Sequence, residues 1–254
     1  MLPLIAETIS SYENIANNLN INSDRLSGTG NRFVSEFEMV ESFADLFHSS
    51  EAENNYNIYR EFECSNGIAD IIIFELRQDW KSSLCLGNIP PRWAYAYRSL
   101  PYRKIFTTED FMALTGISQQ RARQALNEFV SLGLCENREK AKSWYKLIQP
   151  RPLVNHIHAI EAKLKNWKRA LEQATRYQDY AEQAWVLLDE KSITPALNNI
   201  EHFKHFDIGL STISRDGVLS SFHTPTIRKP KSEIYFWQAN SLIAQYLQNK
   251  NHLR

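Results

Sequence analysis

Apolar residues in the first part of the chain recur every three or four positions, which is the spacing of one face of an α-helix. They are Phe33, Phe37, Val40, Ala44 and Phe47. The spacing predicts an amphipathic helix that turns these side chains toward a core. Glu36 lies at the border of the apolar stripe, and Glu41 lies between the apolar and polar faces.

Two runs rich in apolar and β-branched residues follow, at positions 57–63 and 68–74. The turn-forming residues 65–67 separate them, so the pattern predicts a β-hairpin. Asp70 interrupts the second run, which is otherwise apolar. Burying a carboxylate there is unfavourable unless it has a partner or a metal ion.

A similar run at positions 156–164 predicts another strand. Because strand side chains alternate, Glu161 and Lys163 project from the same face, beyond the apolar Ile157 and Ala159. A helical pattern at 167–182 and an apolar run at 184–188 come next, which is typical of a parallel βαβ unit.

The C-terminal part predicts a helix at 195–202, a strand at about 206–213 and a helix near 235–248. Strands and helices therefore alternate in the parts of the chain that flank its middle third. The expected fold is α/β, with a mixed central sheet flanked by helices.

Prolines divide the chain at two places, at Pro90 and Pro91 and again at Pro150 and Pro152. We expect a first part of one domain at 1–80, an inserted domain at 81–151 and the second part of the first domain at 152–254. Residues 1–80 hold 4 basic and 14 acidic side chains, residues 81–151 hold 12 and 5, and residues 152–254 hold 13 and 10. The inserted domain is therefore the basic part of a chain whose net charge is zero.

Within the inserted segment, residues 107–114 and 118–132 predict two helices joined by a tight turn at Gly116. A hairpin with a charged tip is expected after them. This order resembles a winged helix-turn-helix, which implies binding of double-stranded DNA through the second helix and the wing. The side chains expected to contact DNA are Gln119, Gln120, Arg121, Arg123 and Gln124 on the helix, and Arg138, Lys140 and Lys142 on the wing.

Composition excludes some classes of protein. The chain has 254 residues, of which 43% are hydrophobic and 23% charged, as in a globular protein. No run of about 18 apolar residues predicts a membrane span, and the first residues do not resemble a secretory signal. Three widely spaced cysteines suggest neither a disulfide framework nor a zinc site, so we expect a reducing cytoplasm.

Asp70, Glu161 and Lys163 are the strongest candidates for chemistry. Two carboxylates at one sheet edge suit Mg²⁺ or Mn²⁺, and an adjacent ammonium can orient a water for phosphodiester hydrolysis. The same three residues also fit an ion pair that only stabilises a sheet edge. Both interpretations stay open on residue type alone.

Three short segments together resemble the PD-(D/E)XK nuclease superfamily. They are Gly67-Ile68-Ala69-Asp70, Ile160-Glu161-Ala162-Lys163 and Gln173-Ala174-Thr175-Arg176-Tyr177, the last being similar to the QxxxY element of the RecB-like branch. The similarity covers about residues 30–80 and 152–190. The chain differs from the common pattern in having no proline before Asp70 and in the long separation of Asp70 from Glu161, which an inserted domain explains.

The resemblance implies a restriction-endonuclease-like sheet and specific roles for residues of this chain. Asp70 and Glu161 would bind the metal, Lys163 would act on the hydrolytic water, and Gln173 and Tyr177 would support the site. The glutamate that many members carry on their first helix corresponds best to Glu36.

The combined hypothesis is a Mg²⁺- or Mn²⁺-dependent DNA endonuclease in which an inserted winged helix holds the duplex. A homodimer or further protein subunits are compatible with it. The alternative is a DNA-binding regulator, or a subunit of an assembly, whose nuclease-like domain is catalytically silent.

Overall fold

A computed structural model describes residues 32–49, 56–64, 67–138 and 143–252 of the chain. The polypeptide forms two compact units. The first unit extends to Leu76 and resumes from Val154 to Lys231, and the second contains Arg77–Leu153 and the chain from Ser232 onward. The second unit therefore interrupts the first.

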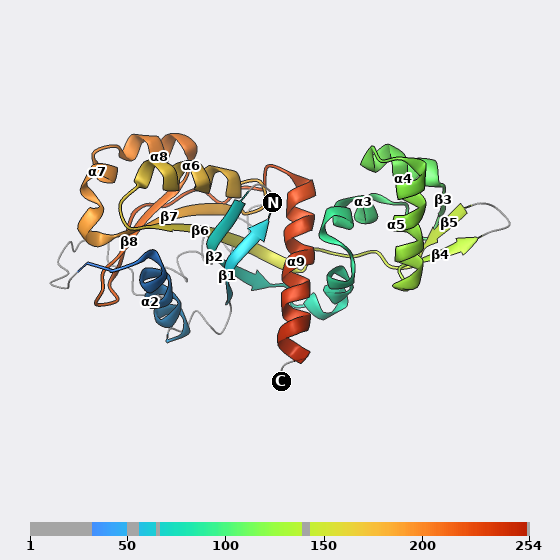
Figure 1. The fold of residues 1–254 in the computed structure, drawn as a ribbon, viewed down its shortest axis with the longest axis horizontal. Helices are drawn as coiled ribbons and strands as arrows, with labels where there is room; N and C mark the ends of the chain where they lie inside the picture. Colours follow the sequence, from blue (N-terminus) through green and yellow to red (C-terminus); the bar gives the residue numbers. More distant parts are fainter. Residues whose placement is uncertain (1–31, 50–55, 65–66, 139–142, 253–254) are drawn as a thin grey trace, which may run out of the picture. The chain divides into compact units, whose positions relative to one another are not determined.

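The first unit is built on a six-stranded mixed sheet (Figure 1). The strands lie in the order β1-β2-β6-β7-β8-β9, and only the pairs β6–β7 and β7–β8 are parallel. This confirms the α/β class with a mixed central sheet. The strands are β1 (Tyr56–Cys64), β2 (Gly67–Leu76), β6 (Val154–Lys163), β7 (Gln183–Asp189), β8 (Gly209–Ile213) and β9 (Leu219–His223).

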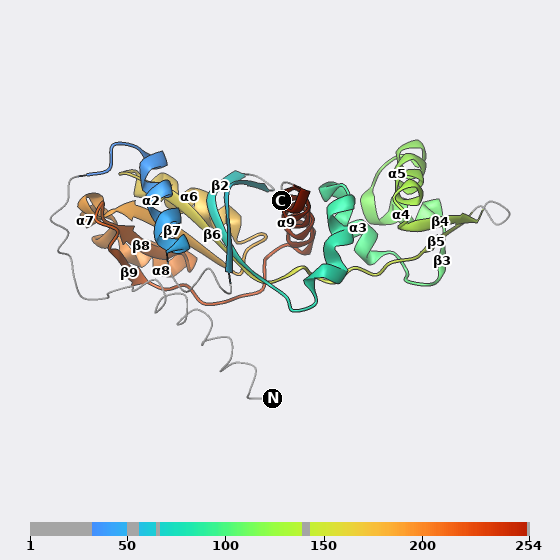
Figure 2. The ribbon, with the colours of Figure 1, turned by 90° about the horizontal axis from the view of Figure 1, so that it is seen from below.

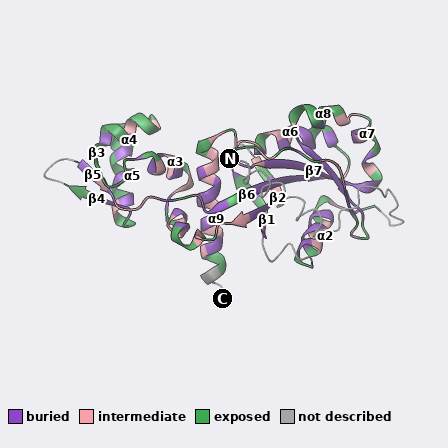
Figure 3. Cartoon of the chain, turned by 180° about the vertical axis from the view of Figure 1, so that it is seen from behind, coloured by how far each residue is buried: buried purple, intermediate pink, exposed green. Residues whose placement is uncertain are grey.

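Helix α2 (Glu36–His48) covers one face of this sheet, and α6 (Trp167–Tyr177) covers the other (Figures 1 and 2). The Ser35 side chain caps α2 by accepting from the Glu38 N–H. Short helices α7 (Thr194–Leu197) and α8 (Ile200–Phe206) follow β7. The sheet is thus enclosed, and β7 is buried along its whole length (Figure 3).

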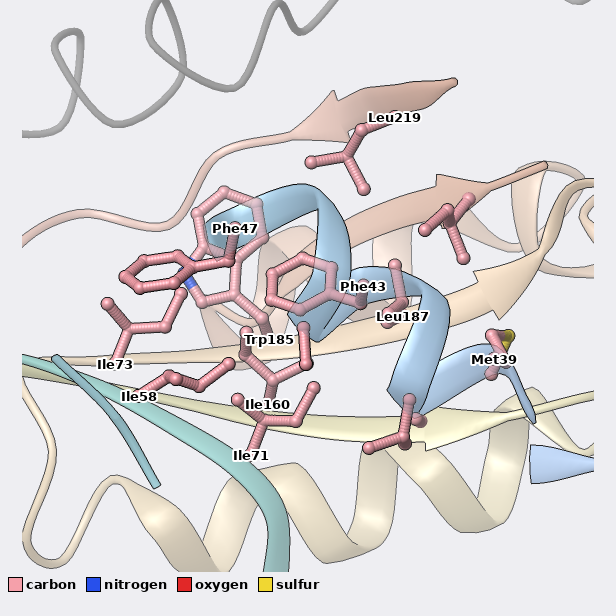
Figure 4. Packing of buried hydrophobic residues seen from close by; sticks show 14 of the residues in the cluster. Met39, Phe43, Phe47, Ile58, Ile71, Ile73, Ile160, Trp185, Leu187 and Leu219 are labelled. Carbon is pink, nitrogen blue, oxygen red and sulfur yellow. The ribbon is translucent and has the colours of Figure 1, made fainter. Parts of the chain in front are cut away.

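The core between α2 and the sheet is made of large apolar side chains from both (Figure 4). Met39, Phe43 and Phe47 of α2 contact a layer that includes Ile71 and Trp185 of the strands. The expected helix is confirmed, but its expected face is partly wrong, because Phe37 is 72% exposed. The buried residues of α2 are Met39, Val40, Phe43, Ala44 and Phe47, so its buried face is rotated away from Phe37 on a helix of 3.6 residues per turn.

Several expected elements of the first unit are confirmed with altered ends. The hairpin is β1 and β2, and the βαβ unit is β6, α6 and β7 with parallel pairing. Helix α6 is shorter than expected, since it stops at Tyr177 and a turn leads to β7. Strand β9 was not expected from the sequence.

The second unit contains a small sheet and several helices. Its three strands lie in the order β3-β5-β4, with antiparallel pairing. In chain order the elements are η2 (Trp80–Asn88), η3 (Pro91–Trp93), α3 (Ala94–Ser99), β3 (Ile105–Phe106), α4 (Thr108–Thr115), α5 (Gln119–Ser131), β4 (Cys135–Arg138), β5 (Ser143–Lys146) and α9 (Glu233–His252).

The turn between α4 and α5 has the chemistry that its sequence predicts. Thr107 and Asp110 form a reciprocal capping box at the start of α4. Gly116 ends the helix with φ of 67°, a left-handed conformation that glycine adopts without steric cost. The two helices are therefore separated by a sharp and well-defined turn.

The C-terminal helix belongs to the second unit, so the expectation that residues 152–254 all join the first domain is wrong. Helix α9 packs on η2 and α3. Ser241 Oγ donates to the carbonyls of Leu86 at 3.1 Å and Ile89 at 2.8 Å, and Asn240 Oδ1 accepts from the Leu153 N–H at 2.6 Å. These buried polar contacts would be lost if α9 packed elsewhere.

None of the helices in the described ranges combines the length and the apolar character needed to cross a bilayer.

Candidate active site

Antiparallel pairing of β2 with β6 brings Asp70 beside Glu161. Ile71 pairs with Ile160, so the next positions on the two strands are neighbours across the ladder. The Asp70 Oδ2 atom accepts a 2.7 Å hydrogen bond from the Ala162 N–H. Residues separated by 91 positions in sequence therefore meet at one place in the sheet.

Lys163 lies at the centre of an acidic cluster, which we define as Glu36, Asp70, Glu161 and Lys163. Its Nζ atom is 2.7 Å from Glu161 Oε1, 3.2 Å from Glu36 Oε2 and 3.7 Å from Asp70 Oδ2. It also donates to the Ala162 carbonyl at 2.9 Å. One ammonium thus faces three carboxylates, which gives the acidic cluster an excess of two negative charges when all four groups are ionised.

Tyr177 of α6 fixes the buried end of this cluster. Its hydroxyl donates to Glu161 Oε2 and lies 2.7 Å from the Ile68 carbonyl. The Glu161 side chain is only 1% exposed, whereas that of Asp70 is 22% exposed. Glu161 is therefore held from both sides, by Tyr177 and Lys163, while Asp70 reaches solvent.

Burial raises the pKa of both inner carboxyl groups. For Asp70, loss of hydration outweighs the Ala162 N–H donor and the charge of Lys163, both of which lower its pKa. For Glu161, loss of hydration and then the Asp70 charge raise the pKa, against the bonds from Lys163 and Tyr177. The lysine therefore compensates the two negative charges incompletely.

The pKa of Lys163 is also raised, although its side chain is largely buried. Burial alone would lower it, but the hydrogen bond to Glu161 and the charges of Asp70, Glu161 and Glu36 together have the larger effect. The ammonium form is therefore favoured in this arrangement. As a cation, Lys163 can donate to a water or to a phosphate oxygen, but it cannot accept a proton.

The remaining residues expected at this site are Glu36, preferred over Glu41, and Gln173. Glu41 pairs with Arg60 of β1, so Glu36 is the glutamate of α2 that joins the acidic cluster, as expected. Gln173 lies one helical turn before Tyr177 and is half-buried. Its Oε1 atom is buried without a hydrogen-bond partner among the described residues, so Gln173 has no direct bond to the cluster there.

The backbone of β1 is strained opposite Asp70. Glu61 has φ of 53° and lies between the Arg60–Ile71 and Phe62–Ala69 pairs. Left-handed backbone of this kind costs a non-glycine residue about 1 kcal/mol. Asp70 therefore has the strained Glu61 beside it on β1 and Glu161 beside it on β6.

The donor atoms of the acidic cluster fit a divalent cation. Within the described ranges, no three His, Cys, Asp or Glu side chains lie close enough to hold a metal by themselves. Asp70 and Glu161 nevertheless offer hard oxygen atoms, the kind that Mg²⁺ and Mn²⁺ prefer, and Mg²⁺ usually keeps several waters. The excess of negative charge in the cluster favours a cation at this position.

A basic segment next to the acidic cluster was not singled out from the sequence. Lys165 lies between β6 and α6, Lys168 and Arg169 lie in the first turn of α6, and all three are exposed. None of them forms an ion pair within the described part of the chain, although Lys168 lies over the Trp167 ring at 5.6 Å. The signal in the sequence was the absence of acidic residues between Glu161 and Glu172.

The residues expected to bind DNA are exposed on the second unit. Helix α5 starts at Gln119 and buries its apolar face, so its first polar side chains are exposed, although Gln119 Nε2 donates to Glu109 Oε1 at 3.4 Å. Arg138 on β4 is exposed and stacks over the Tyr145 ring at 4.7 Å. Lys140 and Lys142 lie outside the described residues. The exposed side chains of α5 are Gln119, Gln120, Arg121, Arg123 and Gln124.

Comparisons of the chain with protein-family models, with curated proteins and with solved structures found no match.

Proposed function

We propose that this protein is a metal-dependent deoxyribonuclease that hydrolyses phosphodiester bonds at the acidic cluster. One observation carries the proposal, namely the 2.7 Å contact of Lys163 with Glu161 on β6 beside Asp70, which comes from a distant segment of the chain. An ordinary surface ion pair would be solvated, whereas these groups are largely buried and their pKa values are perturbed. Perturbed, convergent ionisable groups are typical of active sites.

The residues of the cluster divide into distinct roles. Asp70 and Glu161 would bind Mg²⁺ or Mn²⁺. The ion would lower the pKa of a coordinated water and neutralise charge on the phosphate. Lys163, held as a cation, donates to the attacking water or to a phosphate oxygen. Tyr177 is a positioning residue, since its hydroxyl fixes the orientation of the Glu161 carboxylate.

A polyanionic substrate suits the surroundings of the cluster. Lys165, Lys168 and Arg169, which form no ion pair with any described residue, follow Lys163 where a phosphate backbone would enter. Phosphate contacts by lysine and arginine supply the sequence-independent part of DNA binding. The sheet order and helix placement of the first unit support a restriction-endonuclease-like fold, which is part of this proposal.

The second unit supports DNA rather than a small phosphodiester as substrate. Its order α3-β3-α4-α5-β4-β5 and its β3-β5-β4 sheet support a winged helix, in which α5 would be the recognition helix. Arg121 and Arg123 would contact the duplex from this helix. The inserted unit would therefore hold DNA for cleavage by the first unit.

The test is cleavage of plasmid DNA by the purified full-length chain with Mg²⁺ or Mn²⁺. Lys163→Met keeps the stem of the side chain but removes the charge, so we expect nicking to fall at least 100-fold. Lys204→Ala, which removes an exposed lysine paired with Glu201, is the matched control and should retain activity. Absence of metal-dependent nicking by the unsubstituted protein refutes the proposal.

A DNA-binding regulator with a silent first unit is the second candidate, because the exposed α5 surface does not depend on catalysis. A gel shift with Arg121→Ala/Arg123→Ala separates the two. Lost binding together with absent nicking by the unsubstituted protein favours the regulator. Unchanged binding removes the DNA role of α5.

A further inference from the structure

A pocket of about 200 Å³ lies in the first unit, at the start of β7. Its walls come from the end of α6, the end of α8 and the segment 226–231. Gln183 in its wall pairs with His158, whereas Lys163 pairs with Leu188 five residues further along β7. At about 3.3 Å per residue, Lys163 is about 16 Å along the strand from Gln183, and Glu161, which pairs with Val186, is about 10 Å from it.

Three basic side chains from one short segment line this pocket. The Nε atom of Arg228 donates to Thr226 Oγ1 at 2.7 Å and lies 3.0 Å from Asp207 Oδ2. Lys231 Nζ donates to Gln178 Oε1 at 2.6 Å. These bonds leave further N–H donors on both side chains, since guanidinium has five and ammonium three.

Lys229 is the least engaged of the three cations. It is exposed and forms no ion pair within the described residues. It lies between the anchored Arg228 and the nearby Lys231 in a segment that begins with Pro225 and contains Pro230. Proline has a fixed φ, so the backbone that presents these charges is restricted before any ligand binds.

Negative charge in the pocket wall is largely neutralised. Asp207 is paired with Arg228 and also accepts from the Thr226 N–H at 3.0 Å. Burial raises the pKa of Glu182 to about 8, even though its carboxylate accepts the Ile157 N–H at 2.8 Å. The raised pKa of Glu182 lowers its negative charge near neutral pH, and Asp207 is already paired, so the three cations are in excess in the pocket wall.

The carbonyl groups at the helix ends do not cancel this positive character. Gln178 Nε2 donates to the carbonyls of Phe206 at 2.9 Å and Asp207 at 3.3 Å, where α8 ends. The Lys231 N–H donates to the Gln178 carbonyl at 2.8 Å, and the Arg228 N–H to the Glu182 carbonyl at 3.2 Å. Carbonyl groups that would repel an anion are already hydrogen-bonded.

We propose that this pocket binds a phosphate monoester through Arg228, Lys229 and Lys231, at a site separate from the acidic cluster. A dianionic tetrahedral group balances the excess positive charge and accepts from several donors at once. The volume accommodates a phosphate with a small part of what it is attached to. The phosphate can belong to a mononucleotide or to the 5′ end of a nucleic-acid strand.

The proposal is tested by calorimetric titration of the full-length chain in sulfate- and phosphate-free buffer. The probes are a nucleoside 5′-monophosphate against its nucleoside, and a 5′-phosphorylated oligonucleotide against the 5′-hydroxyl form. We expect the phosphate group to improve affinity at least tenfold in the first pair. An equal gain in the second pair identifies strand ends as ligands, and no gain there restricts the pocket to mononucleotides.

Lys229→Ala/Lys231→Ala should abolish this tenfold gain, whereas Lys204→Ala, outside the pocket wall, should not change it. Since Lys229 forms no described ion pair, its single substitution preserves folding and should alone lower the gain several-fold. The proposal is overturned if the phosphate group gives no gain with either probe pair, or if Lys204→Ala reduces the gain equally. Cleavage is not needed for these titrations, so their outcome is independent of the nuclease assay.

Discussion

Replacing Lys163 by methionine tests the electrostatic description of the acidic cluster without relying on catalysis. The substitution keeps most of the apolar stem and removes the only positive charge that the described structure places among Glu36, Asp70 and Glu161. Glu161 is then a carboxylate of 1% exposure without its cation. Its remaining donor is the Tyr177 hydroxyl.

The expected loss of stability is about 2–3 kcal/mol at pH 8. Breaking a fully buried ion pair by removing one partner costs about 3–5 kcal/mol. The loss expected here is smaller than that range, because 13% of the Lys163 side chain and 22% of the Asp70 side chain remain exposed. With a urea m-value of about 1.5 kcal/mol/M, the unfolding midpoint of the first unit should fall by about 1–2 M.

The loss should depend on pH in a defined direction. Burial and the Asp70 charge already raise the pKa of Glu161 in the folded state, and removal of Lys163 raises it further. A carboxyl group whose folded pKa is raised stabilises the protein at low pH, and this stability is lost as pH rises through the folded pKa. The difference between variant and unsubstituted protein should therefore be small at pH 5 and large at pH 8.

Urea unfolding at pH 5 and pH 8, followed by circular dichroism, measures both effects. Lys165→Met, two positions away at an exposed site, is the control and should change the midpoint by less than 0.3 M. Mg²⁺ should restore part of the loss, because a cation replaces the missing charge. Equal losses at the two pH values would refute the electrostatic reasoning, as would a similar loss in the control.

Three further substitutions probe other parts of the structure by the same unfolding measurement. Tyr177→Phe should lower the stability of the first unit by about 1–3 kcal/mol, because Glu161 loses a buried donor; no change would show that the hydroxyl does not hold the carboxylate. Glu61→Gly should raise stability by about 0.5–1 kcal/mol, because glycine adopts the left-handed backbone without steric cost. Glu63→Gly in the same strand should lower stability. A loss of stability in both variants would show that Glu61 is not strained. Burial lowers the pKa of Lys146 to about 7, so the second unit should gain stability between pH 7 and 9, and Lys146→Met should remove that gain; a retained gain assigns the pH dependence to another group.

The fold was predictable where hydrophobic periodicity was strong. The apolar run around Asp70, with the turn formers before it, and the continuous apolar run at 184–188 correctly gave the hairpin and the parallel strand. Strand β9 was missed because Leu219–His223 is short and half-exposed at the sheet edge, so its pattern is weak. Phe37 was misplaced because the helix also carries apolar residues at Met39 and Phe43. The spacing is therefore compatible with more than one rotation of the helix against the core.

The destination of the C-terminal helix could not be predicted from local pattern. Its sequence correctly indicated a helix, but nothing within it states which of two units supplies the partner surface. The decisive contacts, such as those of Ser241 with Leu86 and Ile89, link positions separated by more than 150 residues. Such pairing depends on the complementary shape of both surfaces rather than on the period of either.

The candidate site was predictable in composition but not in detail. Asp70 stood out as a carboxylate in an apolar strand, and Glu161 and Lys163 as a pair on one strand face. That Glu36 rather than Glu41 joins them follows from helical phase, and the structure agrees. The pocket at Arg228 was not predictable, because its lining comes from three segments without a regular pattern.

The wide separation of Asp70 from Glu161 is compatible with a stable site because the ends of the insertion meet. Leu76 pairs with Val154, and the Arg77 N–H donates to the Leu153 carbonyl at 3.1 Å. Loop-closure entropy grows only as the logarithm of loop length, so even a long unfolded connection would cost little more than a short one. An insertion that folds with adjacent ends holds β2 and β6 together as a short turn would. The register that places Asp70 beside Glu161 is therefore set by strand pairing, and the length of the inserted chain can change without moving the site.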